Sequence, residues 1–122
     1  MPKTVLLVED EPLISLEVAG YLSDLGFPVL VAFNGADAIG VLESRISELI
    51  AILTDIRLGG GPNGWQVGRR ARELEPAMPV FYMSGDSSPD WSTHGVSGSQ
   101  MLAKPFEPGV LASVMSYLVE AS

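Results

Sequence analysis

TVLLVEDEP, residues 4–12, is a short apolar run followed by three acids and a proline. Residues 4–8 are continuously apolar and rich in β-favouring side chains, which is typical of a central parallel strand covered by helices on both faces. Pro12 predicts a helix start, because the first residue of a helix does not need the N–H that proline lacks. The acids at positions 9–11 therefore lie at the carboxyl end of a buried strand.

Outward from this stretch, short β-rich runs alternate with longer segments of helical spacing. We expect strands at residues 4–8, 28–33, 49–54, 80–84 and 100–103, and helices that begin at Pro12, after Asn34-Gly35, near Trp65 and near Pro108. Gly26 ends the first helix, and a turn at Asn34-Gly35 precedes the second. This alternation predicts a single α/β domain, residues 1–122, with a parallel sheet wrapped by helices.

Helical spacing also predicts which side chains are buried. In the first helix these are Ile14, Val18, Tyr21, Leu22 and Leu25; in residues 65–75 they are Val67, Ala71 and Leu74, with Arg69, Arg70, Arg72 and Glu73 facing outward. We expect Trp65 and Trp91 to be partly exposed and His94 to lie on the surface. Residues 85–99 are rich in Gly, Ser and Pro, which favour turns, so we expect at most a short helix there.

Length, charge and residue content exclude several classes of protein. The chain has 122 residues, 47% of them hydrophobic, which suffices for one core. A formal net charge of −8 argues against direct binding to nucleic acid, which needs clustered Lys and Arg. The chain contains no cysteine, and it shows neither a signal peptide nor a run of about 18 apolar residues. We therefore expect a soluble cytoplasmic protein that binds neither nucleic acid nor membrane.

Polar side chains gather at the carboxyl ends of the predicted strands, where ligands of open parallel sheets bind. Glu9, Asp10 and Glu11 follow the first strand, Asp55 follows the third, Ser84 ends the fourth and Lys104 follows the fifth. Taken alone, Asp10 and Glu11 are equally suited to cap the first helix, and Lys104 alone would be an ordinary surface lysine. Together, these side chains predict one site at the mouth of the sheet.

The chemistry of this group points to a metal and a phosphoryl ligand. Crowded carboxylates repel, so they must take up a proton or bind a cation, and hard oxygen ligands suit Mg²⁺. Asp10 and Asp55 are the natural direct ligands, and Asp55 would keep one oxygen free to attack phosphorus. Lys104 would stabilise charge on the phosphoryl oxygens, and Ser84 is placed to donate a hydrogen bond to them. A cis peptide before Pro105 would fix the turn that aims Lys104.

The segments VLLVEDEP, ILTDIRL, VFYMSGD and MLAKPF, in this order and spacing, resemble the receiver domains of two-component response regulators over essentially the whole chain. The resemblance implies a flavodoxin-like, doubly wound, five-stranded parallel sheet of order 2-1-3-4-5, flanked by about five helices. It also implies that Asp55 accepts a phosphoryl group from a phosphohistidine, on a sensor histidine kinase or a histidine phosphotransfer protein.

The resemblance further assigns roles to the residues around Asp55. It implies that Glu9 and Asp10 form, with Asp55, an acidic pocket for Mg²⁺ or Mn²⁺, and that the backbone carbonyl of Arg57 is a further ligand. Ser84 and Lys104 match the family's switch hydroxyl and phosphate-binding lysine. Such a domain is a phosphoacceptor that assists its own phosphorylation and dephosphorylation, and it is not an enzyme acting on other substrates.

Three features differ from the family's usual pattern. Met101 stands three positions before Lys104, where family members commonly carry an aromatic residue that couples to the switch hydroxyl. A methionine can repack into gaps, but it offers neither a ring nor a hydroxyl. The loop after Asp55, IRLGGGPNG, is one residue longer than the common pattern and has Gly where Met-Pro is frequent. The weakly helical residues 87–99 belong to a face that often mediates output or dimerisation in the family.

We therefore expect a stand-alone, phosphorylation-controlled switch that changes its binding surface for a downstream protein, whose identity stays open, as does homodimerisation on activation. The alternative is a pseudo-receiver that binds its partner constitutively. An enzyme or cofactor-binding protein on the same architecture is disfavoured, because the loop EDEP repels phosphate. The chain also lacks a P-loop, a G-x-S-x-G elbow and a D-x-D motif after a strand.

Overall fold

The computed structural model describes residues 2–85, 90–105 and 107–121. Its parallel sheet has the order β2-β1-β3-β4-β5. The strands are β1 (Thr4–Val8), β2 (Val29–Ala32), β3 (Leu49–Asp55), β4 (Val80–Ser84) and β5 (Gln100–Ala103). The predicted flavodoxin-like, doubly wound sheet is thus confirmed. Its continuously apolar strands lie inside the sheet, where both of their faces are covered.

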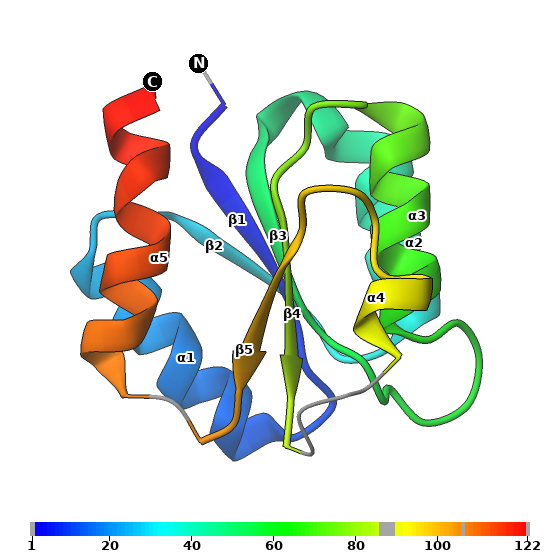
Figure 1. Ribbon diagram of the computed structural model, residues 1–122, viewed down its shortest axis with the longest axis horizontal. Helices are drawn as coiled ribbons and strands as arrows, with labels where there is room; N and C mark the ends of the chain where they lie inside the picture. Colours follow the sequence, from blue (N-terminus) through cyan, green and yellow to red (C-terminus); the bar gives the residue numbers. More distant parts are fainter. Residues whose placement is uncertain (1, 86–89, 106, 122) are drawn as a thin grey trace.

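Helices cover both faces of the sheet. They are α1 (Pro12–Asp24), α2 (Gly35–Arg45), α3 (Gly64–Leu74), α4 (Trp91–His94) and α5 (Pro108–Ala121), with a 3₁₀ turn at Ile46–Glu48. Figure 1 shows α1 and α5 on one face and α2 and α3 on the other, with the carboxyl ends of the strands at the lower edge. Among the described residues, none of the helices combines the length and the apolar composition that crossing a bilayer requires.

The sheet separates two apolar cores. On the α1 and α5 side, Val5 and Leu7 of β1 pack with Val18, Leu22, Leu111 and Met115. On the α2 and α3 side, Leu6 and Val8 of the same strand pack with Ala38, Leu42, Val67 and Ala71. Successive side chains of a strand point to opposite faces, so each strand contributes to both cores. The predictions of which helix residues face the core are therefore largely confirmed.

The helix starts and stops follow local signals. Pro12 is the first residue of α1, and Gly26 follows the helix with a φ of 93°, in the left-handed region that glycine favours. The prediction of a separate turn at Asn34-Gly35 is wrong. Asn34 is the N-cap of α2, its side chain accepts a hydrogen bond from the N–H of Asp37, and Gly35 is the first residue of the helix.

Two predictions of exposure were also wrong. Leu25, expected on the buried face of α1, is 38% exposed, because it lies one residue beyond the last turn of the helix. Trp65, expected to be partly exposed, is buried in the first turn of α3, where its ring packs on that of Tyr82 with centroids 4.8 Å apart. Trp91 is partly exposed and His94 is exposed, as predicted.

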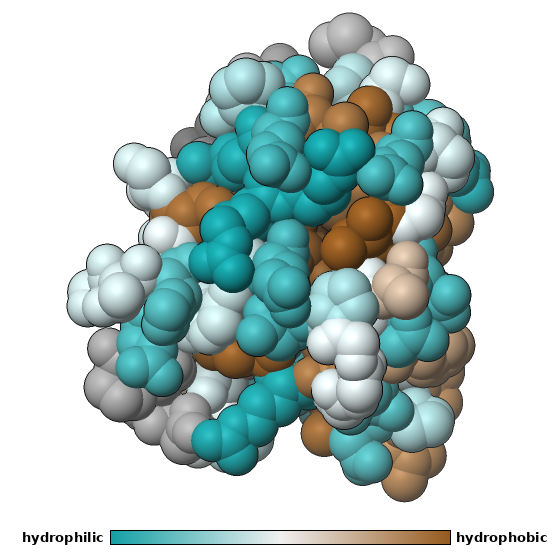
Figure 2. Space-filling view, turned by 90° about the vertical axis from the view of Figure 1, so that its right-hand side faces the viewer, coloured by the Kyte–Doolittle hydropathy of each residue, from teal (hydrophilic) through white to brown (hydrophobic). Residues whose placement is uncertain are grey.

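The outward basic residues of α3 have different surroundings. Arg70 forms ion pairs with Glu43 of α2 at 2.8 Å and with Glu73 at 3.3 Å. Figure 2, which views the molecule from the α2 and α3 side, shows hydrophilic residues across much of this face. Arg72, however, does not simply face solvent: its guanidinium donates to the backbone carbonyls of Met78 and Ser97, each at 2.6 Å.

The fourth helix is short, as predicted. α4 has four residues, and residues 86–89, which were part of the same prediction, lie outside the described residues. Single side-chain contacts hold the segment that follows: Val96 donates its N–H to the Tyr82 hydroxyl at 3.2 Å, and Trp91 Nε1 donates to Ser99 Oγ at 3.0 Å. This segment depends on isolated bonds to α3 and β4 rather than on a long helix.

Candidate functional site

Three strands bring the predicted polar residues to one edge of the sheet. Glu9 and Asp10 follow the end of β1, Asp55 is the last residue of neighbouring β3, and Lys104 follows β5. Because the strands are parallel, their carboxyl ends meet at the same edge, where open α/β sheets bind ligands. In Figure 1 this is the lower edge of the sheet.

The acids form a cluster that fits a divalent cation. Glu9, Asp10 and Asp55 each offer a carboxylate oxygen, and these oxygens lie within 4.8 Å of one another. Glu9 is buried, Asp55 is half-buried and Asp10 is exposed, so the cluster opens to solvent on one side. Such an open set of hard oxygen ligands suits Mg²⁺, which keeps several waters when bound.

Lys104 reaches across the sheet edge into the acid cluster. Its Nζ forms an ion pair with Glu9 Oε1 and lies 3.1 Å from Asp55 Oδ2. The N–H of Lys104 also donates to the backbone carbonyl of Ser84 at 2.7 Å, which ties the lysine to the end of β4. The Lys104–Pro105 peptide bond is cis, as predicted.

Local hydrogen bonds orient Asp55. Its Oδ1 accepts the N–H of Ile56 at 2.8 Å, and its Oδ2 faces the Lys104 ammonium. On the backbone side, the Thr54 hydroxyl donates to the Asp55 carbonyl at 2.8 Å. Both carboxylate oxygens and the carbonyl therefore have assigned donors, so the carboxylate is held in one direction before any ligand arrives.

Burial and charge determine the protonation of the pair. Burial raises the pKa of the Glu9 carboxyl to about 7, although its hydrogen bond to Lys104 opposes the shift. Burial alone would lower the pKa of Lys104, but the Glu9 hydrogen bond and the charge of Asp55 outweigh it and raise that pKa. The lysine is therefore a permanent cation beside Asp55 at neutral pH.

The alternative that the first acids serve as a helix cap has little support. Glu11 is the N-cap of α1, yet within the described part of the chain its side chain makes no capping hydrogen bond. Its N–H instead donates to Glu9 Oε2 at 3.3 Å. The backbone after β1 thus helps to hold Glu9 in the cluster.

The other predicted site residues lie on β4, on β5 and in the loop after β3. Ser84 is buried at the end of β4, the strand that pairs with β3. Arg57 follows Asp55 by two positions, and its side chain is exposed. Met101 of β5 is half-buried against the core on the α2 and α3 side, and its partner in the β4 register is Tyr82.

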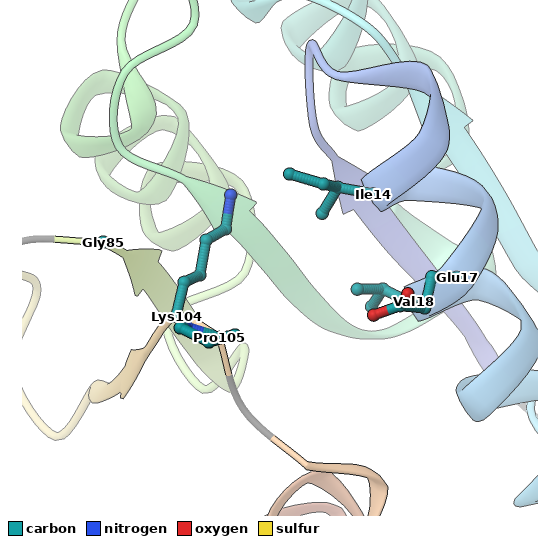
Figure 3. Close-up of a pocket in the computed structure, with 6 residues that line it drawn as sticks. All are labelled: Ile14, Glu17, Val18, Gly85, Lys104 and Pro105. Carbon is teal, nitrogen blue, oxygen red and sulfur yellow. The ribbon is translucent and has the colours of Figure 1, made fainter.

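A cavity adjoins the lysine. It has a volume of about 420 Å³ and is lined by Ile14, Glu17 and Val18 of α1 and by Gly85, Lys104 and Pro105. Figure 3 shows the Lys104 side chain extending from the end of β5, across from Ile14 on α1. Sequence patterns did not indicate this cavity, because it forms between α1 and segments that lie far from it along the chain, at Gly85 and at Lys104-Pro105.

Sequence analysis also missed several supporting residues. Thr54 and Gly64 contact the backbone of Asp55, and Tyr82 holds Val96. A tyrosine inside an otherwise apolar strand was the one available signal, because a buried hydroxyl needs a hydrogen-bond partner. Its partner is a backbone N–H on a distant loop, which no local pattern reveals.

A family model described as the response regulator receiver domain matches residues 5–116. The chain belongs to this family. It is thus a receiver domain of the two-component signalling kind, and receiver domains are phosphoacceptor signalling modules that interact with histidine kinases or phosphotransfer proteins.

Solved structures agree with this assignment. A response regulator receiver protein from Sinorhizobium medicae is 40% identical, with a TM-score of 0.91 over 98% of this chain and 96% of that one. The receiver domain of the sensor histidine kinase PA1611 from Pseudomonas aeruginosa is 26% identical, with a TM-score of 0.84 over 98% and 99% of the two chains. That receiver domain was crystallised with a magnesium ion coordinated in its active-site cleft.

Curated relatives match through part of their length. The autoinducer 1 sensor kinase/phosphatase LuxN of Vibrio campbellii is 36% identical over 84 residues, which are 69% of this chain and 10% of LuxN. The chain spans half or less of the length of the curated relatives that it matches. The similarity therefore concerns the receiver module.

Proposed function

We propose that this receiver domain accepts a phosphoryl group on Asp55 from a phosphohistidine of a sensor kinase or phosphotransfer protein. One observation carries the proposal: the Asp55 carboxylate lies within 4.8 Å of the Glu9 and Asp10 oxygens and 3.1 Å from the Lys104 ammonium. A nucleophilic carboxylate, a metal-binding acid pair and a fixed cation are the parts that phosphoryl transfer to a carboxylate needs.

In the proposed reaction, an Asp55 oxygen forms a bond to phosphorus while the phosphorus–nitrogen bond of the donor breaks. The imidazole nitrogen keeps the electron pair of that bond and takes up a proton. Lys104 stabilises the charge on the phosphoryl oxygens, and Ser84, at the end of β4, donates a hydrogen bond to the same group. Bound Mg²⁺ would neutralise further phosphoryl charge, held by Glu9, Asp10, Asp55 and the carbonyl of Arg57.

The crowding of acids supports this role over a purely structural one. Three clustered carboxylates, two of them paired with a single lysine, leave excess negative charge at the sheet edge, which is unfavourable without a further cation. A constitutive binding module has no need of such crowding. The cluster is therefore better explained as a site that binds a metal and then a phosphoryl group.

The phosphodonor is expected to approach over α1. Leu13 and Leu16 on this helix are 78% and 72% exposed, and Ile14 and Val18 line the cavity beside Lys104. Apolar side chains this exposed on a helix suit a partner protein. A helix that presents a phosphohistidine from this side would reach the lysine and Asp55 together.

The test uses a small phosphodonor, which needs no partner protein. The wild type, incubated with acetyl phosphate and Mg²⁺, should gain the mass of one phosphoryl group, and Asp55→Asn should not. Beryllofluoride with Mg²⁺ should shift the amide resonances of residues around Asp55, Ser84 and Lys104 in the wild type alone. A wild type that gains no mass and shows no shifts would favour the constitutive pseudo-receiver.

A further inference from the structure

Two helices on the same face of the sheet begin with the same residue pair. Asn34-Gly35 opens α2 and Asn63-Gly64 opens α3, and each asparagine caps its helix through its side-chain oxygen. Both glycines are buried, and both have no room for a side chain. The two pairs open neighbouring helices that contact each other, and they differ in what the glycine touches.

Gly64 packs on the peptide that joins Asp55 to Ile56. A Cβ placed on Gly64 would collide with the Asp55 carbonyl oxygen and would lie 2.7 Å from Ile56 Cα and 2.9 Å from the Asp55 carbonyl carbon. The N–H of Gly64 also donates to the Ile56 carbonyl at 2.8 Å. The φ of Gly64 lies outside the left-handed region, so space rather than backbone conformation requires glycine here.

Gly35 meets a different part of the chain. A Cβ placed there would collide with the Pro62 carbonyl oxygen and would lie 2.7 Å from the Pro62 carbonyl carbon. Pro62 belongs to the far end of the loop between β3 and α3, which Figure 1 shows extending away from the sheet. The steric conflict at Gly35 is thus as severe as at Gly64, but it does not involve Asp55.

The peptide under Gly64 orients the Asp55 carboxylate. It supplies the Ile56 N–H that binds Asp55 Oδ1, and its carbonyl accepts the Thr54 hydroxyl from another direction. A methyl group at position 64 must push this peptide, because the neighbouring atoms are backbone and cannot rotate away. The Ile56 N–H would move with the peptide, and the carboxylate would turn with it.

We propose that Gly64 is a positioning residue for Asp55: its missing side chain sets the plane of the Asp55–Ile56 peptide and thereby the direction of the carboxylate. The inference rests on the proposed role of Asp55 as phosphoacceptor and metal ligand.

The experiment compares Gly64→Ala with Gly35→Ala as a matched control. Both variants place the same methyl group against a backbone carbonyl at the first residue of a helix, so both should lower the thermal midpoint by similar amounts. At a temperature where both are folded, Gly64→Ala should bind Mg²⁺ about tenfold more weakly than the wild type, and Gly35→Ala should bind it normally. In metal-free protein, the Ile56 amide resonance should shift only in Gly64→Ala.

Each result has a separate meaning. Equal Mg²⁺ affinity and an unmoved Ile56 amide in Gly64→Ala would overturn the inference, since Gly64 would then be a packing residue alone. If Gly64→Ala does not fold, Thr54→Val tests the same peptide without added volume: it should weaken Mg²⁺ binding while Thr54→Ser retains it, and equal binding in both would overturn the inference. A wild type that does not bind Mg²⁺ would instead contradict the proposed function.

Discussion

The sheet edge at β1 and β3 and the segment around α4 are built in different ways. At the sheet edge, acids at the ends of neighbouring strands are brought together by the parallel sheet, and Lys104 joins them through two ion pairs. α4 has only four residues. The loop that follows it is held by isolated hydrogen bonds to the side chains of Tyr82, Trp91 and Arg72. The site is therefore a consequence of the sheet, whereas the α4 segment depends on a few side chains.

This difference indicates how the two regions can respond to change. A charged ligand at the sheet edge meets groups that are already oriented, so binding needs little rearrangement there. The α4 segment has few contacts to lose, and such regions open at low free-energy cost. The first region should be sensitive to charge, and the second to the loss of single hydrogen bonds.

The largest expected effect is on the sheet edge, through Lys104→Met. Removal of the cation beside Asp55 should slow phosphorylation by acetyl phosphate about hundredfold, or roughly 2.7 kcal/mol of transition-state stabilisation. Mg²⁺ should bind no more weakly, because the acids lose a competing positive charge. Lys3→Met, at an exposed lysine, is the control and should change neither quantity. If Lys104→Met lost Mg²⁺ affinity to the same extent as phosphorylation rate, the variant would be locally unfolded instead.

Acidity tests the same region next. With a pKa of about 7 when folded and about 4.5 when unfolded, Glu9 binds more protons in the folded state between these values. The contribution of Glu9 to the free energy of unfolding of the metal-free protein should therefore be largest below about pH 4.5. This contribution should fall by up to roughly 3 kcal/mol as the pH rises from there through about 7.

Denaturant unfolding across this pH range measures the effect. Glu9→Gln should flatten the fall between pH 4.5 and pH 7, and Glu17→Gln, at an exposed position of α1, should not. If the free energy of unfolding had the same pH dependence in the wild type, Glu9→Gln and Glu17→Gln, the buried Glu9 carboxylate would keep its charge throughout this pH range.

A smaller effect is expected around α4, through Tyr82→Phe. Loss of the hydroxyl leaves the Val96 N–H without its acceptor, which should lower the free energy of unfolding by about 1–2 kcal/mol and speed amide exchange at Val96. Mg²⁺ affinity should not change. Tyr21 is half-buried on α1, and the control variant Tyr21→Phe should leave amide exchange at Val96 unaltered. A weaker metal site in Tyr82→Phe would show that the two regions are not separate.

The smallest effect is expected from Arg72→Ala. Two backbone carbonyls, at Met78 and Ser97, would lose their donor, at a cost of about 1 kcal/mol in unfolding free energy measured by denaturant. Arg69→Ala, at an exposed neighbour on the same helix, should leave stability unchanged within error. If the two variants behave alike, the Arg72 bonds do not stabilise the segment.

Much of the site was predictable because it depends on strand ends. Apolar runs located the strands, parallel order placed their carboxyl ends together, and the polar residues that follow could be listed directly. The burial of Trp65 and the hydrogen-bond partners of Arg72 were not predicted, because a helical period indicates the direction of a side chain but not which other segments of the chain pack against it. Trp65 meets Tyr82, and Arg72 meets the loop before β5, which folds over it.

The sequence by itself determined the strands and the residues of the acid cluster, because these follow from short-range patterns and from the rule that parallel strands end at one edge. The strand order followed from the resemblance of four motifs to the receiver family. Only the tertiary structure decided how Asp55 is aimed, where the cavity beside Lys104 opens and what holds α4. Those features depend on packing between segments far apart in the chain, such as Gly64 against the Asp55 peptide, and packing distances are not encoded in any local pattern.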